Sequence, residues 1–89
     1  MAESLIRRNL DVSELEHPEP MEQIMEILPE LNLGEYLYVT HRREPYPLYT
    51  ILETMGFNYQ CNCLGVGDYE IFIWSKQDKQ AETYFSQQN

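Results

Sequence analysis

The sequence predicts an α+β two-layer sandwich with the element order β-α-β-α-β-β. Three observations predict it: two helix-like segments begin at closely spaced prolines, a strand-like segment precedes each, and a glycine-containing turn joins two further strand-like segments. Proline suits the first turn of a helix, because its φ is already helical and no hydrogen bond is lost there. Strands joined by one helix run parallel, whereas a tight turn joins antiparallel strands. The expected sheet is therefore mixed and four-stranded, with both helices on one face.

The first strand and the first helix meet at the motif His17-Pro18-Glu19-Pro20. Leu10 to Val12 form a short strand before this motif. Apolar residues at helical spacing follow it, at Met21, Ile24, Leu28 and Leu31. We expect the helix to run from Pro18 to about Leu28, because Pro29 would break it. His17 is expected at or near the N-cap, and Glu19 at the positive end of the helix dipole.

The second strand and the second helix repeat this arrangement. Residues 35–41 are rich in aromatic and β-branched side chains, which is typical of a strand. Leu37 and Val39 are expected on one face of the sheet, and Tyr36 and Tyr38 on the other. Glu44-Pro45-Tyr46-Pro47 then begins a helix that ends at Gly56, since glycine readily takes the left-handed conformation after a helix.

The last two strands, residues 57–64 and 69–75, flank Gly65-Val66-Gly67-Asp68, which is typical of a hairpin turn. Beyond Trp74 the chain becomes polar, and we expect a frayed tail with at most a short helix near Thr83 to Phe85. The predicted organisation is a flexible arm over residues 1–8, one domain over residues 9–75 and this tail over residues 76–89.

Composition limits the class of protein. Eighty-nine residues can bury one modest core, so a single domain is expected, as a monomer or a homodimer. Fifteen acidic against six basic residues give a net charge of −9, which argues against nucleic acid or an anionic membrane as a partner. The first ten residues lack the apolar core of a signal peptide or a membrane span, so we expect a cytoplasmic protein.

Residues 9–75 resemble the TusA/SirA-like fold of sulfur-carrier proteins. The resemblance rests on four segments: Leu10-Asp11-Val12, His17-Pro18-Glu19-Pro20-Met21, Gly34-Glu35-Tyr36-Leu37 and Glu44-Pro45-Tyr46-Pro47-Leu48-Tyr49. The first, second and fourth of these segments together are most similar to an uncharacterised branch of that fold. In the sulfur carriers a cysteine opens a Cys-Pro-x-Pro motif and carries a persulfide, whereas His17 occupies that position here. The resemblance implies a sheet whose fourth strand lies between the second and the third.

A candidate anion site lies where the first two strands end. Parallel strands would bring His17 and His41 to one edge of the sheet, beside two helix N-termini. Free backbone N–H groups there favour anions, and Arg42 and Arg43 follow directly. We therefore expect a small-anion or carboxylate site made by His17, Glu19, His41, Arg42, Arg43 and Tyr46. The simpler alternative is that His17 only caps a helix while both arginines pair with Glu44 or Glu16 in solvent.

Cys61 and Cys63 offer an alternative function, sulfur transfer or redox chemistry, in which one of their thiolates replaces the missing cysteine. An i, i+2 pair on one strand is too far apart for easy bridging, so both are expected as free thiols. Packing into the core beside Phe57 and Tyr59 is the simpler interpretation, because cysteine is often buried. The spacing lacks the second ligand pair of a zinc site, and we expect neither a metal nor another cofactor.

An aromatic patch is expected on the sheet face that the two helices leave open, formed by Tyr36, Tyr38, Phe72 and Trp74. Exposed aromatic patches usually mark an interaction surface. Alternatively, the N-terminal arm or the Tyr84-Phe85 segment covers them. The sequence has no serine nucleophile elbow, phosphate-binding glycine loop or dinucleotide motif. It therefore favours a non-enzymatic module that binds another protein or a small anion.

Overall fold

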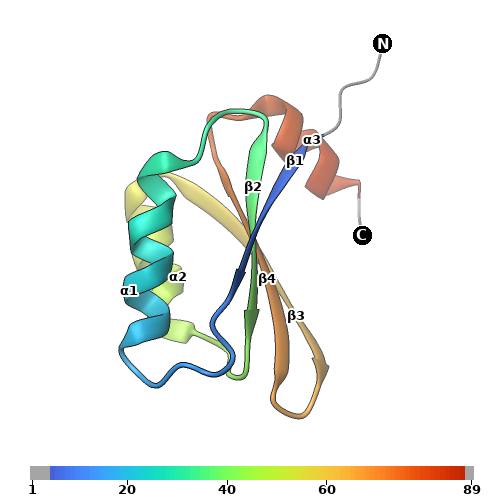
Figure 1. Cartoon of the computed structure of the whole chain (residues 1–89). Coiled ribbons are helices and arrows are strands. Elements are labelled where there is room, and N and C mark those ends of the chain that lie inside the picture. The colour runs from blue at the N-terminus through green and yellow to red at the C-terminus, as the bar shows by residue number, and fades with distance from the viewer. Residues whose placement is uncertain (1–4, 88–89) are drawn as a thin grey trace.

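The computed structural model describes residues 5–87 and confirms the α+β fold, with one helix more than expected (Figure 1). The elements along the chain are β1 (Ile6–Asp11), α1 (Glu19–Ile27), β2 (Glu35–His41), α2 (Tyr46–Met55), β3 (Phe57–Gly65), β4 (Asp68–Ser75) and α3 (Lys79–Ser86). A short 3-10 turn, Leu28–Glu30, follows α1 and contains Pro29, so the regular helix ends where the proline requires it.

The four strands form one mixed sheet in the order β1-β2-β4-β3. β1 and β2 are parallel, with Leu10 opposite Val39, and β4 runs antiparallel to both of its neighbours. The expectation that the fourth strand lies between the second and the third is therefore confirmed. The β3–β4 hairpin turns at Val66 and Gly67, and Gly67 has the positive φ that such a turn requires.

α1 and α2 cover one face of the sheet, and the main core lies between these two layers (Figure 1). Leu37 and Val39 of β2 point into this core, as expected. Its fully buried residues come from both layers and from the link after β1: Val12, Ile24, Leu28, Leu37, Val39, Leu48, Leu52, Ile71 and Ile73. Each such side chain contributes about 1.5–3 kcal/mol by leaving water, so this layer supplies most of the hydrophobic stabilisation.

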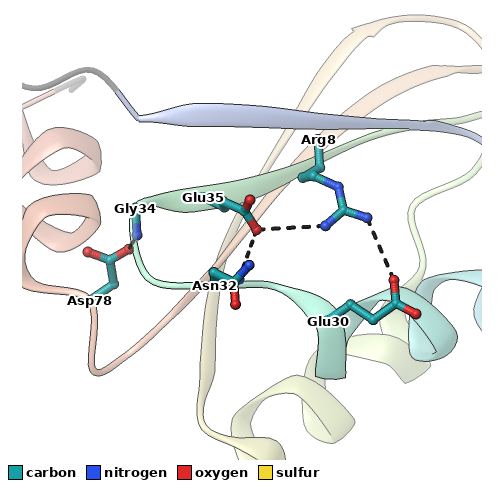
Figure 2. A network of polar contacts seen from close by, with 6 residues as sticks. All are labelled: Arg8, Glu30, Asn32, Gly34, Glu35 and Asp78. Atoms are coloured by element: carbon teal, nitrogen blue, oxygen red, sulfur yellow. Dashed lines mark hydrogen bonds and ion pairs between the residues drawn. The ribbon is translucent and has the colours of Figure 1, made fainter.

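The C-terminal segment forms α3 on the other face of the sheet, so the expectation of a frayed tail was wrong (Figure 1). Asp78 caps this helix by accepting a hydrogen bond from the Ala81 N–H at 3.1 Å. Its second carboxylate oxygen accepts from the Gly34 N–H at 2.7 Å, a contact that Figure 2 shows beside β2. The polar composition of this segment concealed the helix in the sequence. One capping residue and one apolar stripe are nevertheless enough to dock it on the sheet.

The aromatic residues of the sheet lie beneath α3 and do not form an open patch. Phe85 stacks on Trp74 with ring centroids 4.1 Å apart and meets Tyr36 edge-on at 5.1 Å. Tyr36 and Trp74 are each only 6% exposed, whereas Tyr38 and Phe72 are half-buried beside them. The alternative that the Tyr84-Phe85 segment covers this face is confirmed.

β1 begins at Ile6, four residues earlier than expected, so residues 6–8 of the expected arm belong to the sheet. Charged side chains hid this strand, as is common at a sheet edge. The guanidinium of Arg7 lies 4.2 Å from the centre of the Tyr38 ring, and Arg8 forms ion pairs with Glu30 and Glu35 (Figure 2). The expectations for residues 1–4 and 88–89 lie outside the described residues.

Candidate functional site

A pocket of about 260 Å³ opens where β1 and β2 end and α1 and α2 begin, and we call it the elbow pocket. Figure 1 shows the carboxyl ends of both strands and the starts of both helices at this one end of the molecule. The residues that line it come from all of these segments: Leu15, His17, Pro20, Met21, Ile24, His41, Arg42, Arg43, Glu44, Pro45, Pro47 and Leu48. Its volume is near the lower bound, about 300 Å³, of small-molecule sites.

The structure brings four of the six expected site residues to this pocket, namely His17, His41, Arg42 and Arg43. Glu19 and Tyr46 do not line it. Glu19 is exposed at the first position of α1, and Tyr46 is 67% exposed at the start of α2. Both stand at the helix starts but outside the pocket, because the first turn of a helix directs its side chains to several sides.

His17 lines the pocket but does not cap α1. Pro18 occupies the N-cap position, no side chain caps the helix, and the His17–Pro18 peptide bond is cis. The imidazole is therefore exposed at the pocket rim and does not bond the amides of the first turn.

The N-terminal amides of the two helices are mostly occupied, contrary to the expectation of free N–H groups. In α1, the Glu19 N–H donates to the Glu16 carbonyl and the Glu22 N–H to the Pro18 carbonyl. In α2, the N–H groups of Tyr46 and Leu48 donate to carbonyls in the preceding turn. The prolines that start each helix supply no N–H at all. An anion here would therefore depend on side chains more than on helix amides.

His41 is the most buried polar group of the pocket. It ends β2, faces the core side of the sheet and is 8% exposed. Its Nδ1 accepts a hydrogen bond from the Arg43 N–H at 3.1 Å, so the neutral ring carries its proton on Nε2. Burial, together with the charges of Arg42 and Arg43, lowers the pKa of His41. Both effects favour the neutral form of the ring.

The Nε2 of His41 has no hydrogen-bond partner within the described residues. Over the same residues, no fully buried side-chain nitrogen or oxygen lacks a partner. Nε2 is therefore not fully buried, and His41 is one of the residues that line the pocket. A pocket residue thus carries an N–H donor without a protein acceptor among the described residues.

The two arginines differ in their pairing. Arg42 forms an ion pair with Glu16 at 2.8 Å and lies 3.5 Å from the Leu15 carbonyl oxygen. The hydrogen bond and charge of Arg42 also lower the pKa of Glu16. Arg43 is exposed at the pocket rim and forms no ion pair within the described residues. The simpler interpretation, a solvated pair with a glutamate, thus holds for Arg42 but not for Arg43.

Glu44 brings a negative charge to the same rim. The Tyr49 hydroxyl donates a hydrogen bond to its carboxylate at 3.1 Å, and Tyr46 interacts with it as well. Neither tyrosine lines the pocket, so the carboxylate is held toward α2 by groups outside the cavity. Arg43 and His17 also line the pocket, and no carboxylate among the described residues is bonded to either of them.

The apolar walls of the pocket were not predicted as site residues. Among them, Ile24 and Leu48 are fully buried and Met21 is half-buried. The signal was present in the sequence, because each proline motif is followed directly by an apolar residue in the first helical turn. Core packing explains the same pattern, and only the tertiary structure shows that these residues also border a cavity.

The two cysteines occupy different environments. Cys61 is half-buried and packs against the main core, as expected, and burial raises its pKa. Cys63 is exposed, so the expectation of core packing was wrong for this residue. The hairpin projects past the start of α2, which leaves its end uncovered (Figure 1). A raised pKa disfavours a thiolate at Cys61, and no basic residue lowers it.

Residues 5–87 contain no cluster of histidine, cysteine and acidic side chains that could hold a metal ion. No helix over this part of the chain has the length and apolar character needed to span a membrane.

The fold and the pocket define a small α+β domain with a ligand-sized cavity at the carboxyl ends of its parallel strands. Over residues 9–75 the chain matches the family described as "Uncharacterized conserved protein (DUF2249)", and it belongs to that family. No curated protein and no solved structure matches the chain significantly.

Proposed function

We propose that this domain is a non-enzymatic module that binds a small anion in the elbow pocket. The observation that carries the proposal is His41, a pocket residue only 8% exposed whose Nε2–H has no protein acceptor among the described residues. A polar group in such a wall is satisfied by whatever enters the cavity, and its N–H requires an acceptor.

Charge at the rim supports an anionic acceptor. Arg43 faces the opening unpaired among the described residues, whereas Arg42 is neutralised by Glu16. A hydrogen bond in which one partner is ionised is roughly twice as strong as a neutral one, so one guanidinium and one imidazole N–H can hold a singly charged group. In a chain of net charge −9, this local cation also offsets the repulsion that an anion meets elsewhere on the surface.

We further propose that the fold is TusA/SirA-like, with His17 at the position of the sulfur-bearing cysteine. Its support is the set of sequence segments that resemble that fold, together with the central position of β4.

The proposal is tested by following amide NMR shifts while the protein is titrated with acetate, thiosulfate or phosphate at constant ionic strength. We expect saturable shifts at Met21, His41, Arg42 and Arg43. The variant Arg43→Glu should weaken binding by at least about tenfold, because a hydrogen bond to a charged group contributes about 1.5–3 kcal/mol.

The matched control is Lys79→Glu, which changes the net charge by the same amount at the start of α3, on the other face of the sheet. It should leave the affinity within about twofold of the unmodified protein. Equal losses in both variants would show that binding follows net charge alone. Absence of saturable shifts with any of the anions would overturn the proposed function.

A further inference from the structure

We propose that the anion of the elbow pocket is a carboxylate joined to an aliphatic body of a few carbons. This inference rests on the proposed function and adds the chemical class of the ligand. It follows from the two unlike halves of the cavity, a polar rim and an apolar interior.

The interior of the pocket is formed by hydrocarbon. Ile24 of α1 and Leu48 of α2 line it and are fully buried, and Met21 lines it and is half-buried. Leu15 and the rings of three prolines complete these walls. Water in such a space has few hydrogen-bond partners, whereas an alkyl chain would make dispersion contacts on several sides. A ligand without apolar atoms would leave this part of the cavity unused.

The rim offers one guanidinium that no carboxylate neutralises among the described residues, that of Arg43. Its donors are the imidazoles of His41 and His17 and the guanidinium of Arg43, because Arg42 is paired with Glu16. Glu44 stands nearby with a negative charge. The first-turn amides that would serve a doubly charged phosphate are mostly bonded to carbonyls. A carboxylate, with two oxygens and one charge, matches these donors better than a phosphate does.

The arrangement orients the ligand. The carboxylate would lie between His41 and Arg43 at the ends of β2 and the following loop, with the chain directed between the first turns of α1 and α2. With about 260 Å³ available, the cavity suits a short aliphatic acid and excludes a long fatty acid chain lying wholly inside it.

The test is a titration series of acetate, butyrate and hexanoate, with hexanamide and inorganic phosphate as comparison ligands, all at equal ionic strength. Each buried methylene should tighten binding by about threefold to fourfold. We therefore expect hexanoate to bind about tenfold more tightly than butyrate, with methyl shifts at Met21, Ile24 and Leu48. Hexanamide should bind at least tenfold more weakly than hexanoate.

A variant pair separates the apolar wall from general effects on the fold. Met21→Gln keeps the length of the side chain but makes this wall polar, and should flatten the dependence of affinity on chain length. Met25→Gln is the control, because Met25 is also half-buried on α1 but does not line the pocket. It should keep the full dependence.

The outcomes distinguish this inference from the proposed function. If acetate, hexanoate and phosphate bind equally, the aliphatic body is refuted and the anion site stands. If hexanamide binds as tightly as hexanoate, the cavity selects apolar ligands without regard to charge, and both proposals fail. If none of the acids and no phosphate bind, both also fail.

Discussion

Removing the side chain of Phe85 should undock α3 from the sheet. Phe85 is 3% exposed, stacks on Trp74 at 4.1 Å with an angle of 14° between the rings, and meets Tyr36 edge-on at 5.1 Å. Phe→Ala at a buried site costs about 3–5 kcal/mol, and each aromatic pair adds about 0.5–1.5 kcal/mol beyond its area. The side chain thus contributes a large part of the stability of a domain this size, which is typically about 5–15 kcal/mol.

The observed loss has an upper limit set by the structure. α3 lies at the C-terminal end of the described chain and can detach while the main core on the other face remains packed. Global destabilisation therefore cannot exceed the free energy of docking α3. We expect about 3 kcal/mol for Phe85→Ala and about 1 kcal/mol for Phe85→Leu, which keeps apolar contact but loses the stacked ring.

Urea unfolding monitored through Trp74, the only tryptophan, measures both effects. The emission of Phe85→Ala should shift to longer wavelength even before unfolding, because undocking exposes the indole. Thr83→Ala, an exposed position of the same helix, is the control and should change stability by less than about 0.5 kcal/mol. An unshifted emission and a loss below about 1 kcal/mol in Phe85→Ala would refute the account of α3 as a docked helix.

Three other predictions concern the pocket histidine, the helix termini and the thiols. Folding lowers the pKa of His41, so the unfolded chain takes up a proton at this residue at a higher pH than the folded protein does. The free energy of unfolding should therefore fall as the pH drops below about 6.5. Urea titrations between pH 5 and 7 should show a weaker dependence on pH in His41→Gln. Gly56 has φ +87°, so Gly56→Ala should reduce the free energy of unfolding by about 1 kcal/mol. Gly65→Ala should reduce it less, because φ is not positive there and a Cβ meets open space. Equal urea midpoints of the two variants would contradict this. Iodoacetamide should label exposed Cys63 much faster than Cys61 in the native protein, as mass spectrometry of timed digests can measure, and similar rates would disprove the difference in burial.

The sequence alone determined the elements that depend on local chemistry. The alternating pattern of residues 35–41 and the left-handed position of Gly56 predicted β2 and the end of α2 correctly, because both signals act within a few residues. The observed starts of α1 at Glu19 and of α2 at Tyr46 both lie within the expected proline motifs for the same reason. Parallel pairing of β1 and β2 brings the residues that follow both strands, including His41 and Arg43, to one edge of the sheet. The sequence predicts this pairing because a single helix joins the two strands.

Only the tertiary structure decided what each of those residues contacts. Arg42 and Arg43 are neighbouring residues of the same type. Glu16, 26 residues away in the sequence, forms an ion pair with Arg42, whereas Arg43 remains unpaired among the described residues at the pocket rim. α3 is likewise polar on average, and its stability comes from Phe85 meeting Trp74 and Asp78 bonding the Gly34 amide 44 residues away. Such long-range contacts are set by how the layers pack, and that information is absent from any local window of the chain.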